Sequence, residues 1–423
     1  MSEEPEINRT AKIKIFGTAG AARGYAIRDF LTRGDVPFEW IELTNDQQAR
    51  AIGLESIGDH RLPVCVFLDG TRLECPTIRQ IAEKLDWYRN PSRSEYDLAI
   101  YGAGPAGLSA AVYGASEGLR TVLIERYIVG GQAGTSSKIE NYLGFPKGIR
   151  GADLAEAARE QACRFGAEIL ILREGVRGEF HPGKGTGYLK DGTKIVAHAT
   201  ICATGVAYRR LNLPNEDRLL GVGVYYGAGA SEASLCRGDE HVYVVGGGNS
   251  AGQAVIHFSR YVPKVTMVIR GAGLKETLSQ YLVDRILSAR NVEVLPNAEV
   301  TALHGDGFLR SISLTNNQTH RQTIVDATRL FLCLGGVPHT EWAVEAGVAR
   351  DAEGYILTGP DLSEVPNYRE NWPLKRTPYY LGTNRPGLFA AGDVRHGSVK
   401  RCASAVGEGA MAVTFVHRYL ANS

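Results

Sequence analysis

Residues 96–107 read YDLAIYGAGPAG, an apolar run that passes directly into three glycines, Gly102, Gly104 and Gly107. The Ala-rich stretch 108–117 follows and has the composition of a helix. Glycines at this spacing allow a tight turn, a close approach of phosphate to the backbone and close packing of a helix on a strand. The stretch therefore predicts a strand–turn–helix unit whose helix N-terminus attracts a pyrophosphate.

A second apolar run, 121–124, follows this helix and ends in Glu125. A carboxylate about 20 residues beyond the glycines can accept hydrogen bonds from a ribose. The alternative is an ordinary glycine-rich turn. The order of strand, glycines, helix, strand and acid favours a dinucleotide site.

The same design recurs near residue 241. An apolar strand, 241–245, enters Gly246-Gly-Gly-Asn-Ser-Ala251, and a helix over 251–260 and a strand over 264–269 are expected after it. The predicted nucleotide contacts here are Gly246, Gly248, Asn249 and Ser250.

We expect Arg270 to stand at the end of the second strand, where the first unit has Glu125, with Lys275 nearby. A cation there can pair with a 2′-phosphate, so NADPH is favoured over NADH. The alternative is an arginine that is merely solvated after an edge strand.

Composition limits the class of protein. The chain has 423 residues, 50 of them glycine, and a formal net charge of +1, which gives no nucleic-acid footprint. No apolar run approaches the roughly 18 residues of a membrane span, and the acidic N-terminus is unlike a signal peptide. The seven cysteines are scattered, and no two form Cys-x-x-Cys. This pattern predicts a cytoplasmic protein with reduced thiols, no metal site and no membrane partner.

The glycine units and several later motifs resemble the low-molecular-weight thioredoxin reductase family over nearly all of 96–423. The FAD-binding positions that the resemblance implies come from five motifs in the family's order. They are Gly102, Gly104, Pro105, Ala106, Gly107, Glu125, Gly130, Gly131, Gln132, Asn141, Thr204, Gly205, Gly392, Asp393, Lys400, Arg401 and Cys402. The resemblance implies an α/β protein in which one Rossmann-type domain is inserted in another, and it implies a homodimer.

The predicted domains are a glutaredoxin-like domain over 1–90, FAD-binding segments over 95–212 and 336–423, and a nucleotide domain over 213–335. The first of these resembles a glutaredoxin or thioredoxin fold through a turn after Phe16 and through Leu62-Pro63-Val64, which is similar to that family's cis-proline motif.

The resemblance also implies that the last helix, expected to begin at 400–403 and to reach His417, points its N-terminus at the flavin. Arg401 would then place a positive charge beside the reduced ring. Alternatively, Lys400 and Arg401 face solvent.

The glutaredoxin-like segment and the reductase-like segment both lack the redox cysteines of the families that they resemble. The glutaredoxin turn falls on Ala21–Gly24, and the reductase pair falls on Gly227–Ala230. Disulfide exchange needs a thiolate and a resolving thiol. Cys402, at a helix start beside Arg401, has the surroundings that lower a thiol pKa, and Cys236 is a second candidate; structural roles are the alternative for both.

Three functions remain open. The first is an NADPH-dependent FAD oxidoreductase whose acceptor is not a disulfide but a quinone, oxygen, ferredoxin or flavodoxin. The second is a redox-silent FAD-binding regulator or scaffold. The third is a flavoprotein fed by a partner independently of NADPH. Tyr225 and Tyr226 could offer an aromatic surface to flavin or substrate, or could lie in the core.

Overall fold

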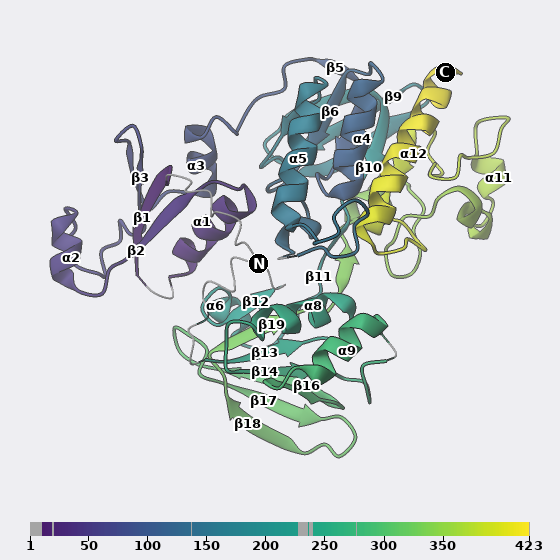
Figure 1. Ribbon diagram of the computed structural model, residues 1–423. Helices are drawn as coiled ribbons and strands as arrows, with labels where there is room; N and C mark the ends of the chain where they lie inside the picture. The colour runs from purple at the N-terminus through teal and green to yellow at the C-terminus, as the bar shows by residue number, and fades with distance from the viewer. Residues whose placement is uncertain are drawn as a thin grey trace. The chain divides into compact units, whose positions relative to one another are not determined.

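The computed structural model describes residues 11–18, 21–136, 138–226, 236, 240–275 and 277–422. The chain divides into two compact units (Figure 1). One contains the residues up to Lys84 together with Leu211–Cys333, and the other contains Leu85–Arg210 together with Leu334–Ser423. Each unit is thus assembled from two segments that are far apart in the sequence.

The N-terminal segment of the first unit is a four-stranded sheet of order β2-β1-β3-β4 with three helices. Strand β1 pairs parallel with β2 and antiparallel with β3. The Leu62–Pro63 peptide bond, which precedes β3, is cis. The elements are β1 (Ile13–Gly17), α1 (Ala22–Arg33), β2 (Phe38–Glu42), α2 (Asp46–Ala51), β3 (Val64–Phe67), β4 (Arg72–Glu74) and α3 (Ile78–Lys84).

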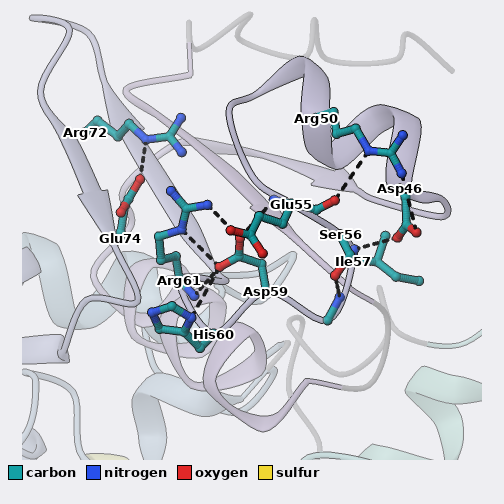
Figure 2. Close-up of polar contacts among 11 residues, drawn as sticks. Asp46, Arg50, Glu55, Ser56, Ile57, Asp59, His60, Arg61, Arg72 and Glu74 are labelled. Carbon is teal, nitrogen blue, oxygen red and sulfur yellow. Dashed lines mark hydrogen bonds and ion pairs between the residues drawn. The ribbon is translucent and has the colours of Figure 1, made fainter.

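Polar contacts close the loop that leads to Pro63 (Figure 2). The Asp59 carboxylate accepts hydrogen bonds from the Glu55 amide at 3.0 Å and from the Arg61 guanidinium at 2.7 and 3.0 Å. These bonds hold the pKa of Asp59 below its usual range. The Asp46 carboxylate accepts from the Ile57 amide at 3.0 Å, so the loop is tied back to α2.

The second segment of this unit is built on a parallel five-stranded sheet of order β12-β19-β13-β14-β15 and an antiparallel sheet of β16, β17 and β18. Its helices and strands are α6 (Glu216–Leu219), β12 (Val224–Tyr226), β13 (His241–Val245), α8 (Asn249–Phe258), β14 (Lys264–Val268), α9 (Gln280–Ser288), β15 (Val292–Leu295), β16 (Ala298–His304), β17 (Ser311–Asn316), β18 (Gln322–Asp326) and β19 (Arg329–Leu332).

The second unit contains a larger sheet of order β7-β6-β5-β10-β9-β8, with β21 on β10, and a small sheet of β11 and β20. The segment before the insertion supplies β5 (Glu95–Tyr101), α4 (Pro105–Ser116), β6 (Thr121–Ile124), η1 (Ala133–Thr135), α5 (Gly151–Arg164), β7 (Glu168–Leu170), β8 (Gly175–His181), β9 (Lys184–Leu189), β10 (Lys194–Cys202) and β11 (Val206–Tyr208). The segment after it supplies β20 (Gly336–Pro338), α10 (Glu341–Glu345), η2 (Gly359–Glu364), α11 (Tyr368–Asn371), β21 (Leu388–Ala390), η3 (Gly392–Val394) and α12 (Cys402–Leu420).

Helix α4 lies between α5 and α12 (Figure 1). A Cβ added at Gly409 of α12 would stand 2.1 Å from the Ala106 carbonyl oxygen of α4. The two helices therefore approach each other closely only because α12 has a glycine there. This contact brings the two ends of the second unit's sequence together at the glycine turn after β5.

Candidate functional site

The first glycine turn has the backbone geometry that its spacing predicts. Gly102 has φ of +102°, and its amide donates to the Ile124 carbonyl at 2.8 Å. A Cβ at Gly102 would meet the Ala203 carbonyl oxygen at 2.4 Å, and one at Gly107 would meet the Gly102 oxygen at 1.8 Å. Neither position has room for a side chain, so β5, β10 and α4 converge on this turn.

The middle glycine instead leaves space for a ligand. A Cβ at Gly104 would find only the Gly131 Cα, at 3.9 Å. Helix α4 begins at Pro105 and has no side chain capping its N-terminus. Its amides and positive dipole end therefore fit a phosphate, as a dinucleotide requires. The Gly130 amide donates to the Ala103 carbonyl at 2.7 Å, so the predicted FAD contacts Gly130 and Gly131 lie beside this turn.

Glu125 follows β6 and is 8% exposed. Its two carboxylate oxygens accept from the Ala103 amide at 2.8 Å and the Tyr127 amide at 2.9 Å. Burial raises the pKa of Glu125, while these two amides favour the charged form. The Glu125 carboxylate therefore holds the glycine turn in place through the Ala103 amide. This structural role was not part of the prediction that Glu125 binds a ribose.

The remaining predicted contacts of the first segment occupy loops at the same end of the sheet. The Gln132 side-chain amide donates to the Val206 carbonyl at 2.7 Å and so joins two of these loops. Thr204 is exposed immediately after β10, and Gly205 has φ of +62°. Asn141 is exposed in the loop before α5.

The late motif supplies a carboxylate that fits a ribityl chain. Asp393 is partly buried, and among the described residues no hydrogen bond to its carboxylate is found. Burial raises the pKa of Asp393. A buried acceptor without a protein donor fits a hydroxyl-rich ligand.

Sequence reasoning missed Glu408, which organises this motif. Its carboxylate accepts from the Gly392 amide at 2.7 Å and from the Arg395 guanidinium at 2.6 Å. In this ion pair Arg395 is buried and Glu408 is partly buried. No sequence signal singles out Glu408, because it becomes a partner of Gly392 only when α12 packs against the loop.

The expected start of the last helix is confirmed, and its expected end is corrected. Helix α12 begins at Cys402 and runs to Leu420, beyond His417. Arg401 is the N-cap, with extended backbone and no capping side chain. Lys400 and Arg401 are both exposed, and the Lys400 ammonium donates to the Tyr355 hydroxyl at 2.9 Å and lies 4.2 Å from the centroid of that ring.

The second glycine turn repeats the first. Gly246 has φ of +141°, and a Cβ there would meet the Cys333 carbonyl oxygen at 2.3 Å. A Cβ at Gly248 would meet nothing within 4 Å. Helix α8 begins at Asn249 rather than at 251, so Ser250 lies in its first turn, and it has no side-chain cap. The Asn249 side-chain oxygen accepts from the Ser279 amide at 2.7 Å, a link that the sequence did not suggest.

The strand registers correct the placement of Arg270. The Gly102 amide pairs with Ile124 and is followed by Glu125, whereas the Gly246 amide pairs with Val268. Ile269 therefore occupies the register of Glu125, and it is 2% exposed. Arg270 lies one residue further and is exposed, as is Lys275. A one-residue offset changes which face of a strand a side chain takes. The offset is also visible in the sequence, because Glu125 lies 23 residues after Gly102, whereas Arg270 lies 24 residues after Gly246.

The model of the pyridine nucleotide-disulphide oxidoreductase family matches residues 96–409. The chain belongs to this family. It is 34% identical over 331 residues to the thioredoxin reductase of Listeria innocua, a match that covers 77% of this chain and 94% of that protein. It is 32% identical to the thioredoxin reductase of Chlamydia trachomatis, with 77% and 98% covered.

Solved structures agree with this membership. The thioredoxin reductase of Lactococcus lactis has a TM-score of 0.68 at 27% identity and is matched over 78% of this chain and 100% of that one. The thioredoxin reductase of T. acidophilum has a TM-score of 0.67 at 29% identity, with 77% and 99% covered. The protein is an NAD(P)H-dependent FAD oxidoreductase of the thioredoxin reductase type, and members of this family bind FAD and use NADPH.

Both cofactors fit the two turns of this oxidoreductase. Around the first glycine turn, the open backbone at Gly104, the uncapped α4 and Asp393, whose carboxylate has no hydrogen bond among the described residues, are available to FAD. At the second glycine turn, Gly248 and the uncapped α8 are available to the nucleotide. FAD supplies the capacity to take up a hydride and release electrons, while the chain's residues bind and orient it.

The prediction that Cys402 has a lowered pKa is wrong. Burial, together with the nearby Asp393 carboxylate, raises the pKa of Cys402 to about 11. The α12 N-terminus does not outweigh the loss of hydration. Cys402 is therefore a protonated thiol at neutral pH. Cys236 is partly buried against the core of the nucleotide domain.

Of the two predicted redox-pair positions, Gly227–Ala230 lie outside the described residues. The other, Ala21–Gly24, forms the start of α1. A Cβ at Gly24 would stand 3.0 Å from the Trp40 ring, so this ring borders the position of the second cysteine.

Tyr225 does not present a free surface. It is 3% exposed and stacks on Phe331, with ring centroids 5.1 Å apart. Of the two alternatives for Tyr225, the structure shows the core position and not the free aromatic surface. Strand β12 is an edge strand, but the Tyr225 side chain packs into the hydrophobic core of the nucleotide domain. Tyr226 is partly buried and its hydroxyl donates to the Glu216 carboxylate.

The residues that the structure describes contain neither a membrane-spanning helix nor a cluster of metal ligands. No helix in that part of the chain is long and apolar enough to span a membrane. No group of three His, Cys, Asp or Glu side chains there is arranged to hold a metal ion.

Proposed function

We propose that this flavoprotein transfers electrons from NADPH through FAD to an acceptor that is not a disulfide. The observation that carries the proposal is the cysteine pattern, because the chain contains no Cys-x-x-Cys. Disulfide reduction by the family's route requires an attacking thiolate and a resolving thiol. The raised pKa of Cys402 argues against that cysteine as a substitute.

The acceptor class follows from what a flavin can reduce directly. We propose a quinone, oxygen, or a small redox protein such as ferredoxin or flavodoxin. The retained second glycine turn, with its uncapped α8 and exposed Arg270 and Lys275, supports NADPH as the donor.

Anaerobic titration tests the proposal. NADPH should bleach the roughly 450 nm flavin band of the purified protein stoichiometrically. Steady-state assays should then show turnover with a quinone or another one-electron acceptor and none with oxidised thioredoxin. Absence of bleaching by NADPH and NADH would favour the redox-silent regulator, and bleaching only by a reduced partner protein would favour the partner-fed flavoprotein.

We further propose that residues 11–84 form a glutaredoxin-like domain without redox function. The β2-β1-β3-β4 sheet and the start of α1 directly after β1 support it. The Trp40 ring beside Gly24 supports the loss of redox function. A homodimer and a cytoplasmic location are also proposed. Light scattering of the purified protein tests the first, and cell fractionation tests the second.

A further inference from the structure

An aromatic cluster joins the N-terminal domain to the core of the nucleotide domain. The Tyr25 ring of α1 lies 5.4 Å from the Tyr225 ring of β12. Tyr225 stacks on Phe331, which stacks in turn on Phe258 of α8 at 4.2 Å. Tyr25 thus packs against the hydrophobic core of the nucleotide domain. The Tyr25 and Tyr225 rings are tilted by 58° to each other, and aromatic pairs at such distances stabilise a contact beyond the area they bury.

The backbone facing Tyr25 is shaped to receive it. Gly221, in the turn between α6 and β12, has φ of +79°. A Cβ built on Gly221 would stand 2.9 Å from Tyr25 Cδ1 and 3.6 Å from Tyr25 Cβ. Any other residue at Gly221 would crowd the ring as well as strain its own backbone. This fit is a second observation, separate from the ring stack.

The part of α1 next to Tyr25 packs against the Trp40 ring of β2. The Arg28 guanidinium lies over the Trp40 ring at 4.3 Å. The same ring fills the space beside Gly17 and Gly24. The first turn of α1, where a glutaredoxin-like domain would carry its thiols, is therefore packed against the Trp40 indole. The same turn presents the Tyr25 ring to the nucleotide domain.

We propose that helix α1 of the N-terminal domain is docked on the nucleotide domain of the same chain. Through Tyr25 it occupies the face of the nucleotide domain formed by Gly221 and Tyr225, and it closes that face to any partner of the thioredoxin or glutaredoxin kind. In the sequence, Tyr225 stands shortly before 227–230, where the family resemblance places the redox pair. The kind of partner that is excluded rests on the proposed function, whereas the docking itself does not.

A cysteine pair tests the docking in the full-length flavoprotein. The 3.6 Å between the two Cβ positions lies within the range for a disulfide, about 3.5–4.5 Å. Tyr25→Cys combined with Gly221→Cys should cross-link under oxidised glutathione at least tenfold more than the control pair Leu68→Cys with Gly221→Cys. Leu68 belongs to the same domain and is 72% exposed. Peptide mass mapping identifies the linked positions. Equal cross-linking of both pairs would overturn the proposal.

A second measurement leaves Gly221 unchanged, in case its substitution prevents folding. Tyr25→Ala should uncover Tyr225 and raise its nitration by tetranitromethane at least fivefold over Leu68→Ala, while flavin absorbance shows that both variants are folded. Unchanged nitration would overturn the proposal. Neither readout uses flavin reduction, so failure of the docking and failure of the proposed electron transfer are seen separately.

Discussion

The two glycine turns share a backbone design and differ in the side chains at its edges. In both, the first glycine has positive φ and faces a carbonyl oxygen that leaves no room for a Cβ, at 2.4 Å for Gly102 and 2.3 Å for Gly246. In both, the middle glycine faces open space and the helix lacks a side-chain cap. The conformation of the phosphate-binding turn is therefore determined by backbone sterics. It is the same in both turns although the neighbouring side chains differ.

The difference lies in the third small residue and in the end of the second strand. The first turn has Gly107 and Glu125, and the second has Ala251 and, in the same register, Ile269. A buried carboxylate braces the first turn, and an apolar side chain lies at that place in the second. The first turn is thus built around a specific hydrogen-bonded acid, whereas any charge recognition in the second must come from outside the strand register.

The largest expected effect is that of a methyl group at the first turn. Gly107→Ala would place a Cβ 1.8 Å from the Gly102 oxygen, and we expect a loss of about 3 kcal/mol or more and release of FAD. The reciprocal control, Ala251→Gly, should cost only about 1 kcal/mol. Thermal unfolding and the flavin-to-protein absorbance ratio measure both. Equal losses would show that the two turns do not differ in packing.

The brace at Glu125 should come next. Glu125→Gln leaves one backbone amide facing a donor, so FAD affinity should fall by about 1.5–3 kcal/mol. Glu174→Gln is a control, because Glu174 pairs with Lys190 on the surface. Flavin release on dilution gives the dissociation constant. Retention of wild-type affinity would mean that the two amides do not depend on the charge of Glu125.

Substitution of Arg270 sharpens the comparison in the second turn. Arg270→Ala should raise KM for NADPH about tenfold and change KM for NADH little, since only NADPH carries the 2′-phosphate. Arg126, the residue after Glu125 in the first turn, provides the matched control as Arg126→Ala. Steady-state kinetics with both nucleotides measure the split. Equal changes for the two nucleotides would remove Arg270 from 2′-phosphate recognition.

The smallest effect is expected at Cys402. With a pKa of about 11, its thiol stays protonated from pH 7 to 9, and thiolate formation increases only as the pH approaches that value. Cys402→Ser should change turnover less than about twofold. Alkylation of Cys402 by iodoacetamide should be slow at pH 7.5 and accelerate up to about pH 11. Fast alkylation at pH 7.5 would contradict the burial argument.

How much was predictable can be judged at particular residues. Gly102, Gly104 and Gly107 could be assigned from sequence, because their spacing encodes a steric requirement that is local to one turn. Glu408 could not, because its role depends on α12 meeting Gly392 across the fold. The prediction for Arg270 was wrong by one position, and the sequence could have corrected it, because the 23 residues from Gly102 to Glu125 lead from Gly246 to Ile269.

The sequence alone determined the two dinucleotide units and the absence of a Cys-x-x-Cys, because each depends on short segments with fixed spacing. The assignment of FAD to the first unit came from the family resemblance. Only the tertiary structure decided the state of Cys402, the burial of Tyr225 and its contact with Tyr25. Those properties depend on which distant side chains remove water from a group, and solvent exclusion is set by packing rather than by local sequence.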